Sequence, residues 1–234
     1  MDARFSFAAG LAILALGSAP AVAQQHKFEI TPQVGYTFGG GFDFEPGVFQ
    51  GEAFPGGKLK LDDTPSYGVT LGFEGRRGAY FTVSYNYQPT QIGIEWNATP
   101  PTIAGIDPNK KGDITLHQVL FGGRWEYMKS SEQKVRPYLG ASAGFVVVDP
   151  NFTTNSGFDP GSDTRFLLGF NGGVRYMFGE EKRFGLQGDI KGTWFWVPNG
   201  EVYVWCDYWY GCSAYEGSAT IAQGTASIGA VIKF

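Results

Sequence analysis

Eight segments of the chain alternate between apolar and polar residues with a period of two. In the first of them, the even-numbered positions from Phe28 to Phe38 are apolar or aromatic, and the odd-numbered positions carry Glu, Thr, Gln or Gly. This pattern is typical of a β-strand with one apolar and one polar face, because successive side chains point to opposite faces. The segments are 28–38, 67–74, 79–87, 113–127, 136–148, 165–178, 184–196 and 220–234. The fourth is the least regular, since Leu116 and Leu120 fall on its polar face.

The connections between these segments alternate in length. Short connections at 75–78, 128–133 and 179–183 alternate with long ones at 39–66, 88–112, 149–164 and 197–218. Short turns at one end and long loops at the other are typical of a barrel in an outer membrane. A soluble β-sandwich also alternates, but its core would not accept the glycines and the charges of both signs found on the polar face. We therefore expect an all-β fold, an eight-stranded antiparallel up-and-down transmembrane β-barrel.

The composition supports a barrel with a lipid-facing surface. Charged residues make up 17% of the chain, against roughly 25% in ordinary soluble domains. Aromatic residues reach 16% and gather near strand ends, as a girdle at a membrane interface requires. These aromatics are Phe28, Phe73, Trp125, Tyr127, Tyr176, Phe178 and Phe184. The net charge of -4 argues against a nucleic-acid partner, because phosphate binding needs a basic face.

The first 23 residues are typical of an export signal. A cation at Arg4 precedes the apolar run Phe5–Leu16, and Ala21–Ala23 fits the small-x-small pattern cut by signal peptidase. The run is too short for an anchor, since it spans about 18 Å against a hydrocarbon core of ~30 Å. We expect residues 1–23 to be a cleaved signal peptide and residues 24–234 to form the barrel domain outside the cytoplasm.

The last segment, Ser227–Phe234, carries a family resemblance. Together with the export signal and the eight amphipathic segments, it resembles the small outer-membrane β-barrel family of the OmpA and OmpX type. In that family the barrel-assembly machinery reads a last strand that ends in Phe. The matching positions are Ile228, Ala230, Ile232 and Phe234. The resemblance implies a monomer in the outer membrane of a Gram-negative bacterium, in contact with lipid and lipopolysaccharide.

Catalytic and metal-binding patterns are missing from the sequence. There are two histidines, His26 and His117, and no His/Cys cluster has the spacing of metal ligands. No G-x-S-x-G motif occurs. Outer-membrane lipid A deacylases place His and Ser two residues apart, whereas Val119 stands two residues after His117. We expect a protein that is not an enzyme and that has no metal or cofactor.

Charged residues on the polar face are expected to meet inside the barrel. Eight strands enclose a space just wide enough for side chains, and an unpaired buried charge is costly. We predict an ion-paired polar plug, with Asp189 and Lys191 near mid-height and the rest nearer the periplasmic end. The predicted members are Glu29, Glu74, Arg124, Glu126, Arg136, Arg175, Asp189 and Lys191. The alternative is that these charges gate a narrow ion path.

The fourth long loop is the most distinctive connection. Cys206 and Cys212 are separated by five residues, and export favours a disulfide between them over two free thiols. The loop is also rich in aromatics, which either form a binding surface or pack on one another. These aromatics are Tyr203, Trp205, Tyr208, Trp209, Tyr210 and Tyr215. The first loop, with its Gly and Pro clusters, and the second are expected to be ordinary flexible turns.

The primary functional prediction is a non-enzymatic integral outer-membrane protein with a structural role in the envelope and with surface-exposed loops. The first alternative is a narrow channel or a transporter of small or apolar solutes, as resemblance to the OmpW type implies. The second alternative is an adhesin or receptor that binds through the aromatic loop at 197–218.

Overall fold

The computed structural model describes residues 28–44, 46–49, 52–99, 111–130, 132–151, 161–197, 202–203, 214–215 and 219–234. The predicted signal peptide, residues 1–23, and both cysteines lie outside these residues. Four of the predicted surface aromatics, Trp205, Tyr208, Trp209 and Tyr210, lie outside them as well.

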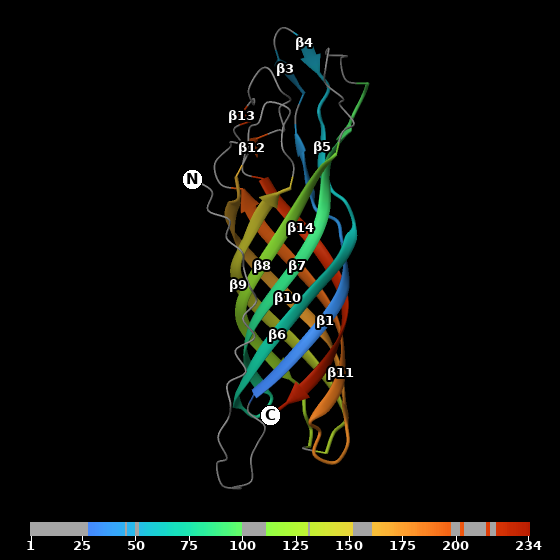
Figure 1. The fold of residues 1–234 in the computed structure, drawn as a ribbon, viewed down its shortest axis with the longest axis vertical. Helices are drawn as coiled ribbons and strands as arrows, with labels where there is room; N and C mark the ends of the chain where they lie inside the picture. Colours follow the sequence, from blue (N-terminus) through green and yellow to red (C-terminus); the bar gives the residue numbers. More distant parts are fainter. Residues whose placement is uncertain are drawn as a thin grey trace.

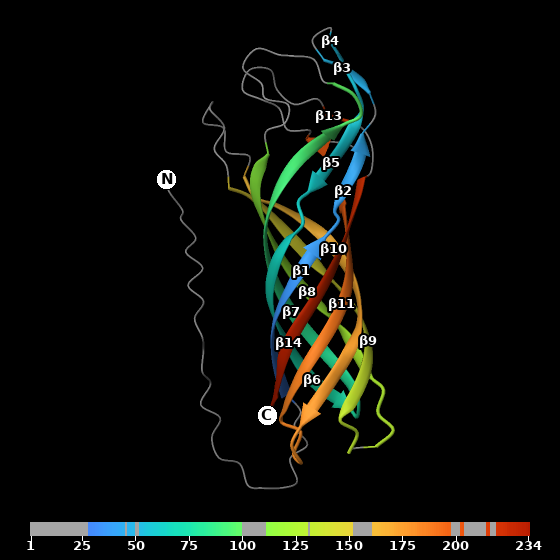
Figure 2. The ribbon, with the colours of Figure 1, turned by 90° about the vertical axis from the view of Figure 1, so that its right-hand side faces the viewer.

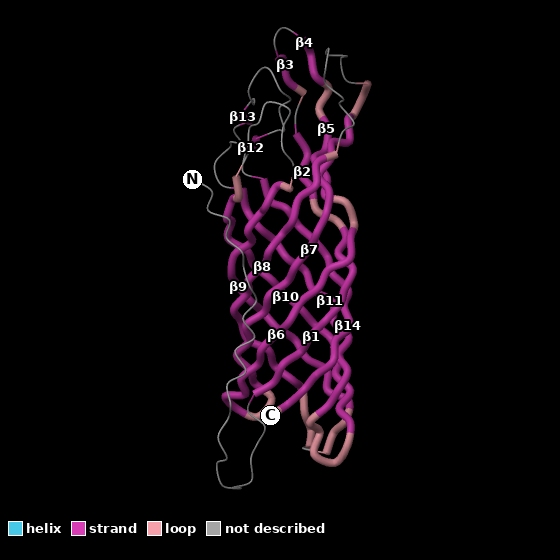
Figure 3. Tube along the Cα trace, viewed as in Figure 1, coloured by secondary structure: helices cyan, strands magenta, loops and turns pink. Residues whose placement is uncertain are grey.

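Eight long strands form a closed antiparallel barrel, which confirms the predicted fold class (Figures 1 and 2). Each strand pairs with its neighbour in sequence, and the last strand pairs with the first. The strands are β1 (Phe28–Phe38), β6 (Thr64–Arg76), β7 (Ala79–Trp96), β8 (Gly112–Glu126), β9 (Val135–Pro150), β10 (Asp163–Phe178), β11 (Phe184–Val197) and β14 (Ala219–Lys233). In Figure 3 nearly the whole barrel wall is strand. The described residues contain no helix long and apolar enough to cross a membrane.

Closure of the barrel joins its first and last strands. Ile30 of β1 pairs with Leu71 of β6 on one side and with Ile232 of β14 on the other. The Phe234 N–H donates a further hydrogen bond of 2.8 Å to the carbonyl oxygen of Phe28. The backbone groups of the first and last strands are therefore paired, as a wall without free edges requires.

The two ends of the barrel differ. The end called the turn end here carries the short connections 77–78, 127–134 and 179–183, and the opposite loop end carries the long ones. The predicted alternation of short and long connections is therefore confirmed. At the turn end, Gly78 and Gly179 have φ of 76° and 69°, a conformation in which glycine is favoured.

The expectation that the first loop is an ordinary flexible turn is wrong. It contains β2 (Gly41–Phe44), β3 (Gly47–Phe49), β4 (Glu52–Phe54) and β5 (Gly57–Leu61). Gly39 and Gly40 have φ of 73° and 107°, which lets the chain bend from β1 into β2. Strand β5 pairs with both β2 and the upper part of β7, so a ribbon extends above the barrel at the loop end (Figure 1).

The second and fourth loops also contain strand. Strand β7 runs on to Trp96, well into the predicted second loop, which begins at residue 88. In the fourth loop, β12 (Val202–Tyr203) pairs with β13 (Ala214–Tyr215). These short pairings bring together the two sides of the segment that contains the cysteines.

The outer wall of the barrel is apolar. Among the described residues, 25 large apolar or aromatic side chains are exposed, including Phe170 (55%) and Ile190 (68%) near mid-height. Charged outward residues of the barrel strands lie only near the two ends. They are Glu95, Asp113 and Asp149 toward the loop end and Arg76 at the turn end, where a register shift pairs it with outward Ala79. Exposed aromatics of the predicted girdle at the turn end are Phe73, Trp125, Tyr127, Tyr176, Phe178 and Phe184.

Candidate functional site

The interior of the barrel is filled by three layers of side chains along its axis. A charged layer occupies the turn end, a small polar cavity lies above it, and an apolar cluster closes the loop end. Glycines on the inward face make room for the larger side chains. A Cβ on Gly72 would meet Glu29 Cγ at 2.7 Å, and one on Gly173 would meet the Tyr138 hydroxyl at 2.7 Å.

Glu29 is the centre of the charged layer. Its carboxylate receives two hydrogen bonds of 2.8 Å from Arg175 and one of 2.6 Å from Arg124 Nη2. Lys233 Nζ lies 3.6 Å from the same carboxylate and donates a hydrogen bond to Tyr80. Strands β1, β8, β10 and β14 are joined at this one acceptor.

Glu126 is the second acceptor of the charged layer. Its carboxylate lies 2.7 Å from Arg175 Nη1, 3.3 Å from Arg124 Nη2 and 3.7 Å from Arg136 Nη1. Arg136 also donates a hydrogen bond of 3.1 Å to the carbonyl oxygen of Gln133 in the turn below. The structure therefore brings together Glu29, Arg124, Glu126, Arg136 and Arg175, five of the eight residues predicted from sequence.

Two tyrosines and a glutamine complete the layer, and the sequence-based prediction did not include them. The Arg124 guanidinium lies 4.3 Å from the centre of the Tyr80 ring, and that of Arg175 lies 5.6 Å from the Tyr138 ring. Arg175 also donates hydrogen bonds of 2.8 and 2.6 Å to Gln187 Oε1. These three residues and Lys233 all lie on the inward face. Their place on the polar side of the alternating pattern is the sequence signal that could have identified them.

Three predicted members are placed outside the ion-pair network. Glu74 is half-buried at the turn end, where it accepts a hydrogen bond of 2.9 Å from the Gly78 N–H. Asp189 accepts hydrogen bonds from the Tyr138 hydroxyl at 2.6 Å and from Asn171 Nδ2 at 3.0 Å. Lys191 is buried but forms no ion pair with a described residue, although Asp189 lies two positions away.

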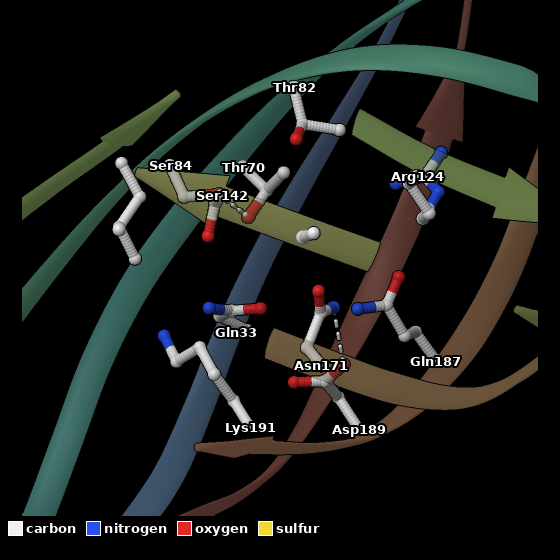
Figure 4. Close-up of a pocket in the computed structure, with 12 residues that line it drawn as sticks. Gln33, Thr70, Thr82, Ser84, Arg124, Ser142, Asn171, Gln187, Asp189 and Lys191 are labelled. Atoms are coloured by element: carbon white, nitrogen blue, oxygen red, sulfur yellow. Dashed lines mark hydrogen bonds between the residues drawn. The ribbon is translucent and has the colours of Figure 1, made fainter. Parts of the chain in front are cut away.

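A polar cavity of about 40 Å³ lies above the charged layer (Figure 4). Its charged lining residues are Arg124, Asp189 and Lys191. The polar lining groups are Gln33, Thr70, Thr82, Ser84, Ser142, Asn171 and Gln187. A buried site needs roughly 10–15 Å³ per water molecule, so the space is suited to a few waters or one small ion.

Part of the loop half of the interior is apolar, which the sequence-based prediction of a polar plug missed. Eight buried apolar side chains pack together there: Leu61, Ile114, Leu116, Leu120, Val146, Leu167, Phe195 and Ile221. Leu120 also lines the polar cavity, so the two layers touch. Leu116 and Leu120, the two residues that broke the alternation of the fourth segment, belong to this cluster.

The outward face carries the remaining residues singled out from sequence. Among the residues proposed as the assembly signal, Ile228 and Phe234 are 68% and 54% exposed. His117 Nδ1 lies 2.8 Å from the Tyr85 hydroxyl on the outer wall, where it faces away from the interior layers. The described residues contain no group of three or more His, Cys, Asp or Glu that could hold a metal ion.

Comparison with known proteins gives matches by structure. No protein-family model matches the chain, and no curated protein matches it by sequence. Neisserial surface protein A matches with a TM-score of 0.51 at 15% sequence identity, over 88% of this chain and 97% of that protein. Outer membrane protein OprG from Pseudomonas aeruginosa matches with a TM-score of 0.54 at 13% identity, over 89% of this chain and 95% of OprG.

Outer membrane protein AlkL, whose structure was determined in lipid bilayers, matches with a TM-score of 0.52. The identity is 13%, and the match covers 94% of this chain and 97% of AlkL. The chain has the fold of the small outer-membrane β-barrels. The resemblance seen in the sequence is thereby confirmed as one of fold.

Proposed function

We propose that this protein is a non-enzymatic integral outer-membrane barrel whose closed interior holds a stable scaffold for its loops. The observation that carries this proposal is the division of side chains between the two faces of one closed sheet. Apolar and aromatic residues cover the outer wall, while ion-paired and apolar layers fill the interior. An exposed apolar surface of this extent is suited to lipid.

The remaining parts of the proposal follow from an outer-membrane location. Residues 1–23 serve as a cleaved signal, and the outward residues of β14 serve as the signal for the barrel-assembly machinery. Lipid and lipopolysaccharide surround the outer wall, and the barrel works as a monomer. The likeness to AlkL, studied in lipid bilayers, supports the membrane location.

Solute flux through reconstituted liposomes tests the closed interior. We expect swelling in small sugars and single-channel conductance to stay at the level of empty liposomes. Steady conductance that changes in Arg175→Ala would show instead that the charged layer gates an ion path. A fold test accompanies it: the folded barrel should migrate differently on a gel before and after boiling.

Transport of small apolar solutes is a second candidate, favoured by the apolar cluster at the loop end. A polar plug alone would offer such solutes no favourable contact, whereas Leu116, Leu167 and Phe195 make part of the barrel interior apolar. Uptake of a labelled alkane into liposomes tests this candidate. Passage at a rate above empty liposomes, reduced by Leu167→Gln, would favour transport over the structural role.

Binding through the fourth loop remains a separate proposal from the sequence. Its support is the aromatic content around Tyr203, together with the β12–β13 pairing that closes the base of the loop. Deletion of residues 208–210 should abolish binding to host cells or matrix if the loop is an adhesive surface. Unchanged binding after this deletion would favour the structural role over the adhesive one.

A further inference from the structure

The interior of the barrel carries more positive than negative charge. The buried cationic side chains among the described residues are Arg124, Arg136, Arg175, Lys191 and Lys233, and the buried carboxylates are Glu29, Glu126 and Asp189. The formal excess is two positive charges, and one remains when half-buried Glu74 is included. Because an uncompensated buried charge is unfavourable, this interior favours a further negative charge that the side chains of the described residues do not supply.

Lys191 is the cation with the least compensation. Its side chain is 8% exposed, and no described residue accepts a hydrogen bond from its ammonium group or forms an ion pair with it. The carboxylate of Asp189 already accepts hydrogen bonds from Tyr138 and Asn171. An ammonium group has three N–H donors, so Lys191 presents unused donors inside the barrel.

Arg124 adds a second cationic side chain to the wall of the same cavity. Its Nη2 bonds to Glu29, but its buried Nε has no hydrogen-bond acceptor. Arg124 and Lys191 both line the cavity of about 40 Å³ (Figure 4). Hydroxyl and amide groups of Thr70, Thr82 and Gln33, which can also donate, line the same space.

We propose that this cavity binds a small inorganic anion of about the size of chloride, held chiefly by Lys191. The anion accepts hydrogen bonds from the ammonium group and from neighbouring hydroxyl and amide groups, and it balances part of the positive excess. A space of about 40 Å³ holds a halide with one or two waters, at roughly 10–15 Å³ per water. It excludes a large organic anion such as gluconate. Asp189, which lines the same cavity, weakens the binding by repulsion.

The direct test is anomalous scattering from the wild-type barrel crystallised in sodium bromide. We expect a bromide peak inside the barrel, in contact with the ammonium group of Lys191. A cavity without an anomalous peak at high bromide concentration would overturn the proposal. This measurement needs no variant, so it is independent of folding defects.

A solution test compares chloride with gluconate at equal ionic strength. The barrel is refolded in detergent in each sodium salt, and the temperature at which the folded gel band disappears is recorded. We expect chloride to raise this midpoint saturably, because an anion that binds only the folded state stabilises it. Equal midpoints in the two salts would overturn the proposal.

Two variants give opposite expectations in the same assay. Lys191→Met should lose the difference between chloride and gluconate, whereas Asp189→Asn should enlarge it, since the amide removes the negative charge that repels the anion. Lys60→Met is the matched control, because Lys60 lies at the loop end in an exposed pair with Glu95. If Lys191→Met keeps the full difference in midpoint between chloride and gluconate, this cavity is not the site. If Lys191→Met fails to fold, Asp189→Asn decides in its place, and an unchanged difference in that variant would also exclude the cavity.

Discussion

Arg175 holds the carboxylate of Glu29 with two parallel hydrogen bonds inside the barrel. Arg175 Nη1 donates to Oε2 and Nη2 donates to Oε1, each over 2.8 Å. The two residues are 146 positions apart in the sequence, and neither side chain has exposed surface. This two-pronged geometry is the strongest that an arginine and a carboxylate can form.

The first prediction concerns the loss of either partner. Glu29→Gln should lower the free energy of unfolding by about 3–5 kcal/mol, because it leaves buried cations without their acceptor. Arg175→Met should cost less, since the interior already has a positive excess and Glu29 keeps Arg124. Urea unfolding in lipid vesicles, followed by tryptophan fluorescence, measures both.

The matched control for this pair is at the turn end. Glu181 forms an exposed ion pair of 2.7 Å with Arg183, so Glu181→Gln should change stability by less than about 1 kcal/mol. Equal stability of Glu29→Gln and Glu181→Gln would contradict the idea that the charged layer stabilises the barrel.

Two glycines on paired strands give a second prediction. A Cβ on inward Gly173 would clash with the carbonyl oxygen of Gly188 and would lie 2.7 Å from the Tyr138 hydroxyl. Gly173→Ala should therefore destabilise the barrel by about 1–3 kcal/mol, as overpacking does. Gly188→Ala, which would meet nothing within 4 Å, should be neutral. The same unfolding assay measures both variants. Similar free energies of unfolding for Gly173→Ala and Gly188→Ala would contradict a steric clash between Tyr138 and a side chain at position 173.

The lipid-facing belt gives a third prediction. Phe170 is 55% exposed at the centre of β10, and Phe170→Lys should cost about 2–4 kcal/mol if this position lies at the bilayer midplane. Tyr127→Lys at the turn end should cost only about 0–1 kcal/mol, because that position lies at the interface. If Phe170→Lys and Tyr127→Lys lower the free energy of unfolding equally, the outer wall does not face a bilayer.

The ribbon above the barrel gives a fourth prediction, on pH. Lys60 Nζ donates a hydrogen bond of 2.8 Å to Glu95, which holds the pKa of the Glu95 carboxyl below its ordinary value. The stabilisation from this pair is present above the pKa that Glu95 has in the unfolded chain. It is lost as the pH falls through the lowered pKa. In Lys60→Met the pKa of Glu95 should rise, as measured by carboxyl carbon NMR, and an unchanged pKa would show that the bond does not persist in solution.

The fifth prediction concerns the cysteines, which lie outside the described residues. If Cys206 and Cys212 form a disulfide, the denatured protein should react with a maleimide only after reduction. Cys206→Ser should react without reduction, because it leaves one free thiol. Labelling of the unreduced wild-type protein at two sites would contradict the disulfide.

The eight barrel strands could be predicted from sequence because period-two alternation runs through each of them, although least regularly through 113–127. The predicted segment 28–38 and β1 coincide, and the predicted segment 184–196 differs from β11 by one residue. The ribbon was missed for a local reason. Gly39 and Gly40 interrupt the alternation before β2, and Pro89 lies within the continuation of β7. These turn-forming residues hide the strands of the ribbon in the sequence, although the strands pair with one another in the folded protein.

The interior could be predicted only in part. Alternation identifies which residues point inward, which is why five of the predicted residues meet in the charged layer. It does not identify which charges meet, because that depends on the stagger of strands far apart in sequence, as with Glu29 and Arg175. The apolar cluster was missed because Leu116 and Leu120 were treated as irregularities, although inward apolar residues on five other strands or ribbons accompany them.

The contacts of Glu29 also have a mechanical consequence. A thin-walled cylinder squeezed from the side first becomes oval, and its wall can bend that way without breaking its hydrogen bonds. Glu29 on β1 is tied across the interior to Arg124 on β8 and to Arg175 on β10, so cross-braces span the cylinder in two directions. Lateral squeezing therefore meets resistance near the turn end, and the circular outline there is preserved when the surrounding bilayer changes thickness or tension.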